Sequence, residues 1–287
     1  MSGIRKILFP VDFSPACEAM APLVVRTATI FSARVTLLYV LEPAATGFEL
    51  TVQTLREVEE YRAKAAEERL QTFLAGPLPA DTCERLVRDG LAAETIAAVA
   101  NQQGFDLIVM PTHAGAFRRM LLGSTSAKVL DSASCPVLTT QHAETISPGP
   151  LQHRRLLCAV TLQSDASRLM AYAAGLAAGM HASCTLVHVI PASEPQSAIQ
   201  LDLEERLQSA ERRSAQQRME RMAQATGLTA KVHIAIGPVK EALIEAARLL
   251  EADVLLIGRS PQTGPSGRLP DLSYALVRDA PCPVLSV

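Results

Sequence analysis

The sequence contains no tryptophan, and aromatic residues make up only 4% of its 287 residues. So few aromatic side chains leave little for the stacking platforms with which proteins hold single-stranded nucleic acid. An excess of one charge is also missing, because 27 basic and 29 acidic residues give a formal net charge of −2. Proteins that grip nucleic acid or anionic membranes do so mainly through positive charge. We therefore expect neither nucleic acid nor a membrane as a partner.

Long hydrophobic runs and paired cysteines are absent as well. No apolar stretch approaches the roughly 18 residues that indicate a membrane-spanning helix. Residues 1–14 lead directly into a strand-like run, without the layout of a signal peptide. The six cysteines form no Cys-x-x-Cys pair, which argues against a disulfide scaffold or a zinc cluster. With 48% hydrophobic residues, the composition predicts a globular protein of the reducing cytoplasm that binds no metal.

Five segments of the first half recur in the same order in the second half. The members of each pair lie about 150 residues apart, and one small insertion or deletion accounts for the only change in spacing. Chance does not keep five segments in order, so the chain is a tandem duplication. The pairs are RKILFPV (5–11) with RRLLCAV (154–160), ARVTLLYVLEP (33–43) with ASCTLVHVIPA (182–192), VRDGLAAETI (87–96) with AIGPVKEAL (235–243), FDLIVM (105–110) with ADVLLI (252–257), and SCPVLTT (134–140) with PCPVLSV (281–287).

Each half alternates short apolar runs with helical stretches. The apolar runs are nearly continuous, as expected for strands that are covered on both faces. Alternation of strand and helix predicts right-handed βαβ crossovers and a parallel sheet. We therefore expect an α/β fold of two tandem repeats, each a five-stranded parallel, doubly wound, Rossmann-like sheet with helices on both faces. The strands expected in the first half are 4–11, 34–41, 82–88, 106–110 and 135–140, and its first two helices are 15–31 and 51–75.

The two repeats are expected to form separate domains. Ser, Pro and Gly residues at 147–150 break any regular element between the repeats. We place the first domain at 1–142, the linker at 143–152 and the second domain at 153–287.

Asp12 directly follows the first expected strand. Ligands of an open parallel sheet bind past the carboxyl ends of the strands, where the strand order reverses. A carboxylate there is suited to accept a hydrogen bond from a ribose or a base. The alternative is a purely structural role, in which Asp12 joins Ser14 and Pro15 in capping the next helix.

Gly123, Ser124 and Thr125 begin a helix after the fourth expected strand. A helix start leaves free N–H groups at the positive end of the dipole, which suits phosphate. Arg118 and Arg119 precede this step and could reach the same anion. A capped helix with two solvated arginines is the structural alternative.

The run ILFPVDFS at 7–14, the Gly-Ser-Thr step at 123–125 and the closing CPVL strands at 135–138 and 282–285 together resemble the universal stress protein family. The resemblance covers almost the whole chain, once in each half. It implies a tandem-domain member with the fold of the adenine nucleotide alpha-hydrolase-like group. One class of the family binds ATP through Gly, two residues, Gly, nine residues, then Gly with Ser or Thr. ATP or a related adenine nucleotide is therefore the implied ligand of the N-terminal half.

The family pattern carries over to five positions of this chain. Gly123 and Ser124 match its last step, and Thr125 follows them. Asp12 matches the acidic residue that approaches the adenosine. Val40 and Met110 stand where apolar contacts to adenine fall.

The loop after the fourth strand departs from the family pattern. Pro111 stands where the first glycine is expected and Ala114 where the second is, with Gly115 one position later. Proline supplies no N–H donor, and alanine resists the positive φ that glycine allows. His113 belongs to the same loop and is a candidate contact, but no nucleophile or carboxylate accompanies it for catalysis. We expect nucleotide binding here to be weakened or altered.

The second half departs further from the family pattern. Thr161 replaces the acidic residue after the first strand of this repeat. Gly258 matches the first glycine, whereas Pro261 falls at the second. No glycine remains at the phosphate position, so no nucleotide is expected in this half.

Two functions follow from these patterns. The first is a nucleotide-binding stress-response module with at most slow ATP hydrolysis, because the chain has no P-loop lysine motif. The second is a nucleotide-free stress-response scaffold that acts through protein contacts or small-ligand sequestration. In either case we expect self-association through the last strands, at 139–140 and 286–287, as an intramolecular pseudo-dimer and as a pairing of two chains. An adenylate-transferring enzyme ranks last, because the acidic cluster for a catalytic metal is missing.

Overall fold

The computed structural model describes residues 3–43, 51–112, 123–141, 155–162, 166–191, 198–259 and 271–287. The chain divides into two compact units, Ser2–Pro148 and Gly149–Val287. The expected linker at 143–152 lies outside the described residues, as do the site candidates His113 and Gly115. None of the helices in the described ranges is both long and apolar enough to cross a membrane.

The first unit contains a five-stranded sheet with the order β3-β2-β1-β4-β5. Every pairing between neighbours in this order is parallel. Strands and helices alternate along the chain, as the repeat pattern predicts. The elements are β1 (Lys6–Val11), α1 (Pro15–Phe31), β2 (Arg34–Leu41), α2 (Val52–Thr72), β3 (Cys83–Asp89), α3 (Ala92–Gln102), β4 (Leu107–Pro111), α4 (Ser124–Ser132) and β5 (Val137–Thr140).

The second unit repeats this arrangement with the order β8-β7-β6-β9-β10, again all parallel. The fold class predicted from the sequence is thus confirmed in both halves. The elements are β6 (Arg155–Ala159), α5 (Ala166–Met180), β7 (Ser183–Ile190), α6 (Ala198–Ala225), β8 (Ala230–Ile236), α7 (Val239–Leu249), β9 (Val254–Ile257), α8 (Asp271–Asp279) and β10 (Val284–Ser286).

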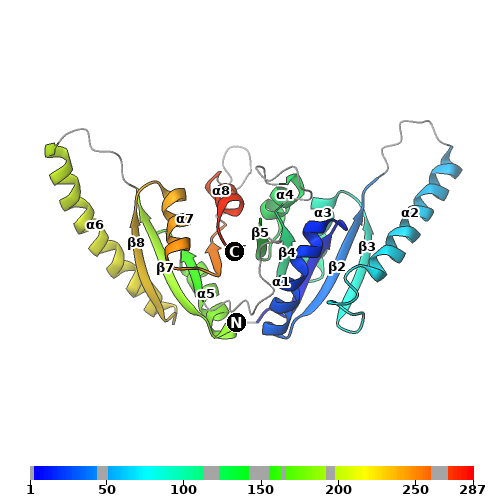
Figure 1. Ribbon diagram of the computed structural model, residues 1–287, viewed down its shortest axis with the longest axis horizontal. Coiled ribbons are helices and arrows are strands. Elements are labelled where there is room, and N and C mark those ends of the chain that lie inside the picture. Colours follow the sequence, from blue (N-terminus) through cyan, green and yellow to red (C-terminus); the bar gives the residue numbers. More distant parts are fainter. Residues whose placement is uncertain are drawn as a thin grey trace. The chain divides into compact units, whose positions relative to one another are not determined.

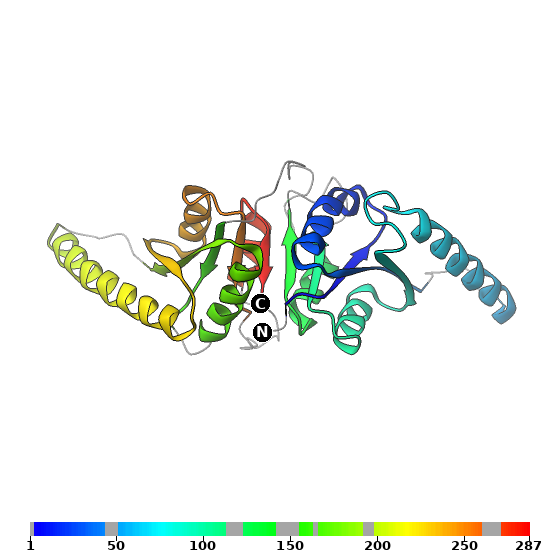
Figure 2. The ribbon, with the colours of Figure 1, turned by 90° about the horizontal axis from the view of Figure 1, so that it is seen from below.

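Helices cover both faces of each sheet, as Figures 1 and 2 show within each unit. The strand order proceeds outward from β1 to β3 and then reverses at β4. Because crossovers are right-handed, this reversal puts α1 and α2 on one face, and α3 and α4, which contact each other, on the other. The central strands are therefore buried on both faces, and Ile7, Leu8 and Phe9 of β1 are fully buried.

Local signals in the sequence fix the start and the end of α1. Ser14 is the N-cap and accepts the N–H of Cys17 at 3.4 Å, and Pro15 occupies the first helical position. The helix ends at Ser32, which adopts the left-handed conformation with a φ of 51°. These caps place the start of the helix directly after β1, at the edge of the sheet where the strand order reverses.

Candidate functional site

The switch point of the first unit lies between β1 and β4. These strands are neighbours, with Ile7 opposite Leu107 and Leu8 opposite Ile108. Since both run in the same direction, their carboxyl ends meet at one edge of the sheet. Asp12 follows β1 at this edge, and α4 starts beyond β4. The structure thus places the residues predicted after the first and fourth strands at the edge where open α/β sheets bind ligands.

Asp12 holds the turn between β1 and α1. Its Oδ1 accepts the N–H of Ser14 at 2.9 Å and the thiol of Cys17 at 3.1 Å. The N-cap of the helix is Ser14, and Asp12 supports the turn that leads to it. The side chain is exposed, and none of the described residues donates a hydrogen bond to its Oδ2. This oxygen is therefore available as an acceptor at the sheet edge.

A cluster of aromatic rings anchors the residue after Asp12. Phe13 has a φ of 61°, and its ring centroid lies 4.5 Å from that of Tyr39 and 5.2 Å from that of Phe73. The guanidinium of Arg69 lies 4.3 Å from the centroid of the Phe13 ring, within the range of a cation–π contact. Sequence reasoning missed this cluster. The spacing of Arg69 and Phe73, one helical turn apart, was the signal that could have revealed it.

The apolar candidates lie within the strands and are covered by the protein. Val40 in β2 is 9% exposed and Met110 in β4 is 5% exposed. Pro111 ends β4, and its carbonyl accepts the hydroxyl of Ser126 at 3.0 Å.

The helix start predicted at Gly123 is confirmed. Gly123 is the N-cap of α4, and no side chain caps this end. Its φ is −61°, so a left-handed backbone is not what requires glycine at this position. The N–H of Gly123 donates to the carbonyl of Thr112 at 2.9 Å. The N–H groups that follow it in the first turn of α4 have no acceptor within the helix, and such groups can bind an anion. Ser124 is exposed and Thr125 is half-buried, while Arg118 and Arg119 lie outside the described residues.

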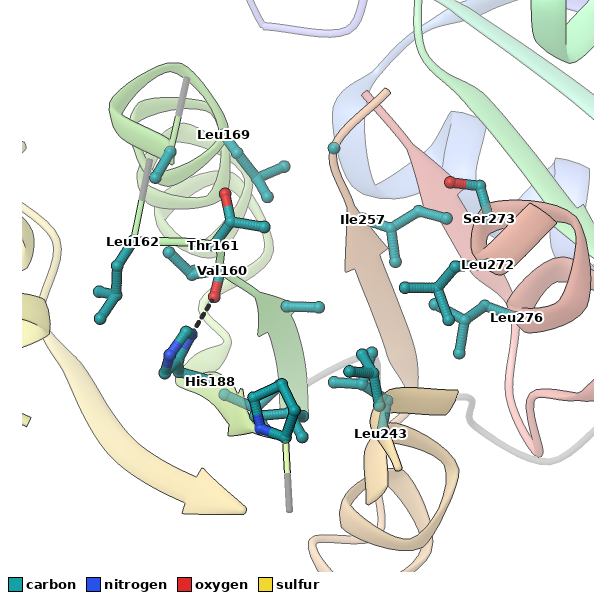
Figure 3. A pocket seen from close by; sticks show the side chains of 17 residues that line it. Val160, Thr161, Leu162, Leu169, His188, Leu243, Ile257, Leu272, Ser273 and Leu276 are labelled. Carbon is teal, nitrogen blue, oxygen red and sulfur yellow. Dashed lines mark hydrogen bonds between the residues drawn. The ribbon is translucent and has the colours of Figure 1, made fainter. Parts of the chain in front are cut away.

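The second unit contains a cavity of about 550 Å³ at the corresponding edge of its sheet. Figure 3 shows residues from β6, β7 and β9 and from the helices around it. Among the described residues that line it, no side chain carries a carboxylate, an ammonium or a guanidinium group. The sequence predicts no nucleotide here, but it gave no sign of the cavity. The lining residues are Ala159, Val160, Thr161, Leu162, Ala166, Leu169, Val187, His188, Val189, Pro191, Val239, Leu243, Ile257, Gly258, Leu272, Ser273 and Leu276.

The cysteines near the sheet edges are poor nucleophiles. Burial, followed by the charge of Asp12, raises the pKa of the Cys17 thiol to about 12. Burial also raises the pKa of Cys184 to about 11 and that of Cys282 to about 12. All six cysteines are free thiols. Within the described ranges no three His, Cys, Asp or Glu side chains gather in a way that could hold a metal ion.

Two tandem, doubly wound parallel sheets define the protein as a duplicated α/β module. The model of the universal stress protein family matches residues 3–141 and again residues 152–287. The chain therefore belongs to the universal stress protein family and carries two of its repeats.

Individual relatives match one repeat or both. Universal stress protein A homolog 2 of Coxiella burnetii is 28% identical over 145 residues, which make up 49% of this chain and 97% of that protein. A universal stress protein of Synechocystis is 30% identical over 135 residues, 47% of this chain and 83% of that protein. The crystal structure of a universal stress protein from Archaeoglobus fulgidus covers 99% of this chain and 96% of its own, with a TM-score of 0.67 and 20% identity. At that identity, the structural likeness establishes the fold alone.

Proposed function

We propose that this chain is a stress-response module whose first half binds an adenine nucleotide, ATP or a related one, past the carboxyl ends of β1 and β4. The observation that carries the proposal is the convergence of Asp12 and the uncapped start of α4 at the point where the strand order reverses. A carboxylate acceptor and a helix N-terminus at one edge suit the two ends of a nucleotide, its ribose and its phosphates.

Each candidate residue has a separate role in this proposal. Asp12 accepts a ribose or base hydrogen bond through Oδ2, since its Oδ1 already holds Ser14 and Cys17. Val40 and Met110 supply apolar contact to the base. The N–H groups of Ser124 and Thr125, which follow the N-cap Gly123, face the phosphates.

The same residues argue for weak binding and against rapid turnover. Pro111 offers no N–H to a phosphate, and the N–H of Gly123 is held by Thr112. The chain lacks the lysine of a P-loop, and no metal-ligating cluster stands among the described residues. We therefore propose binding that shifts the population of a conformer, with slow hydrolysis or none.

Calorimetric titration of the full chain with ATP tests this proposal, after the protein has been assayed for nucleotide carried through purification. Asp12→Asn keeps an oxygen for the Ser14 turn but loses the charge, and should weaken binding about tenfold, or 1.4 kcal/mol. Gly123→Val puts a branched side chain at the helix start and should abolish binding. Asp81→Asn makes the same charge change at an exposed site before β3 and should bind as the parent does.

Each result of the titration bears on the proposal. Saturable heat that both site variants reduce supports a nucleotide in the first half. Absence of both carried nucleotide and heat in the parent, at protein concentrations that detect a millimolar site, rejects it. Equal binding by the parent and Gly123→Val also rejects it, because the ligand would then lie elsewhere.

The second candidate is a scaffold that works through self-association. Within each unit the last strand, β5 or β10, ends the strand order, and such an edge is a template for a further strand. We propose self-association through these edges, as an intramolecular pseudo-dimer and as a pairing of two chains. Light scattering of the eluting protein over a hundredfold range of concentration tests the pairing of two chains. The six free thiols also favour the reducing cytoplasm as the compartment.

A further inference from the structure

The cavity of the second unit differs in chemistry from the candidate nucleotide site of the first. Its walls are aliphatic side chains from strands β7 and β9 and from helices α5, α7 and α8, together with the segment that follows β6. The polar side chains among them are Thr161, His188 and Ser273 (Figure 3). The Nδ1–H of His188 is already used, because it donates to the carbonyl of Val160 at 2.9 Å. The lining therefore offers apolar contact and few hydrogen bonds.

Comparison of the two repeats explains why there is room at this edge. Leu162 and His188 line the cavity, and the repeat alignment pairs them with Phe13 and Tyr39. In the first unit those two rings pack against each other with centroids 4.5 Å apart. The second unit thus has a leucine and a histidine where the first has a closed pair of rings.

The lining also argues against a phosphate-bearing ligand. Burying a phosphate without a cation is strongly unfavourable, and none of the cavity-lining residues that the structure describes is a lysine or an arginine. Arg218 on α6 is not among the lining residues, and its guanidinium donates an Nη2–H to the carbonyl of Leu162 at 3.0 Å. The helix at the phosphate position, α8, begins with an aspartate, Asp271, where α4 begins with Ser124. An acidic residue type at this position of the sequence disfavours an anionic ligand, because like charges repel.

We propose that this cavity binds a small uncharged molecule with an aromatic or branched aliphatic body and at most one or two hydroxyl or carbonyl groups. A volume of about 550 Å³ lies within the range of about 300–1,000 Å³ that holds small ligands. The duplicated chain then carries two sites of different specificity, and this second site does not depend on nucleotide binding by the first half.

The test is a fluorescence titration of the full chain with N-phenyl-1-naphthylamine, an uncharged probe with an aromatic body. The absence of tryptophan keeps the protein background low. Gly258→Leu should weaken binding at least tenfold, because a Cβ at this position meets Leu169 Cδ2 at an ordinary 3.7 Å and the longer side chain then fills the cavity. Gly76→Leu is the matched control, since a Cβ there has nothing within 4 Å.

A double variant, Leu162→Phe with His188→Tyr, restores the residues of the first unit and should also weaken binding. It keeps the test decisive where Gly258→Leu fails to fold, as judged by circular dichroism. We expect saturable binding by the parent and by Gly76→Leu that ATP does not displace. No saturable binding, undiminished binding by either folded cavity variant, or displacement by ATP overturns the proposal. Asp12→Asn should leave the titration unchanged, which separates this site from the nucleotide proposal.

Discussion

The carboxylate of Asp106 accepts the backbone N–H of Lys6 at 3.0 Å, across the amino ends of β4 and β1. The same oxygen accepts the N–H of Arg5 at 2.8 Å. The second repeat contains the same contact, since Asp253 accepts the N–H of Arg155 at 3.0 Å. In both units the contact joins the two central strands, whose opposite ends form the switch point. Both repeats have thus kept this hydrogen bond at the amino ends of the two strands, whereas the residues at the carboxyl ends differ between the repeats.

Asp106→Ala should lower the free energy of unfolding of the first unit by about 1–3 kcal/mol, because two N–H groups lose a charged acceptor. Asp253→Ala should do the same in the second unit, where the carboxylate accepts the N–H of Arg155 and lies 3.9 Å from the Nε of that residue. Urea unfolding of the full chain measures both changes. Asp81→Ala, an exposed control, should stay within about 0.5 kcal/mol of the parent. If Asp106→Ala lowered the free energy of unfolding no more than the control does, the hydrogen bonds of Asp106 would add no stability.

Cys17 should resist alkylation by iodoacetamide in the folded chain at pH 8. Its pKa of about 12 leaves almost no thiolate, which is the reactive form, and the thiol is buried. In urea the thiol should react at the rate of an ordinary cysteine. Asp12→Asn removes the neighbouring negative charge, lowers the pKa and should speed the reaction in the folded state. Peptide mapping by mass spectrometry follows the label at Cys17, and fast labelling of the native parent would contradict the assigned environment.

Asp279 should support the second unit at neutral pH and lose this effect in acid. A hydrogen bond from Arg278, opposed by desolvation and aided by Lys240, lowers the pKa of Asp279 to about 2. Lys240 Nζ lies 2.9 Å from Oδ2 of Asp279, and this ion pair links α7 to the end of α8. Both helices contribute residues to the lining of the second-unit cavity. Because the folded pKa lies below the unfolded value of about 3.9, the stabilisation is present above pH 4 and is lost as the pH falls towards 2.

Denaturant unfolding of Asp279→Asn and the parent at several pH values checks this expectation. The variant should be less stable than the parent at pH 7, and the difference should shrink steadily from pH 5 downwards. Asp81→Asn should show little difference from the parent at any of these values. A gap for Asp279→Asn that stayed constant with pH would mean that the charge of Asp279 is not the source of the effect.

The architecture could be predicted from the sequence because strands that are buried on both faces consist of nearly continuous apolar residues. Continuous apolar runs mark the strands, so β2 at 34–41 and α1 at 15–31 agree with the predicted bounds. Motifs likewise located Asp12 and Gly123 at the switch point, though what they bind stays a prediction. The cavity could not be predicted, because its existence depends on how side chains from several elements pack. A leucine in place of Phe13 looks conservative in sequence, yet Leu162 lines the cavity of the second unit whereas the Phe13 ring packs on Tyr39.

The stack of Arg69 on Phe13 should contribute measurably to the stability of the first unit. The guanidinium lies 4.3 Å from the ring centroid, where contacts of this kind are worth about 0.5–1 kcal/mol at exposed sites. A double-mutant cycle with Arg69→Met and Phe13→Leu isolates this energy, because methionine keeps the alkyl stem and leucine keeps an apolar contact with Tyr39. We expect a coupling of at least 0.5 kcal/mol in urea unfolding.

The matched cycle replaces Arg69→Met by Arg88→Met, since Arg88 is exposed on β3 and donates to the carbonyl of Val87. Its two substitutions should be additive, and a coupling as large as that of the Arg69 cycle would show that the signal is not specific to the stack. Phe13 also follows Asp12 directly, so loss of the stack should loosen the carboxylate as well as the helix. Arg69→Met should therefore weaken ATP binding by less than Asp12→Asn does, because the carboxylate remains but is held less firmly. Unchanged ATP binding by Arg69→Met, in a parent that binds, would separate the stack from the site and leave it a purely structural contact between α2 and the turn after β1.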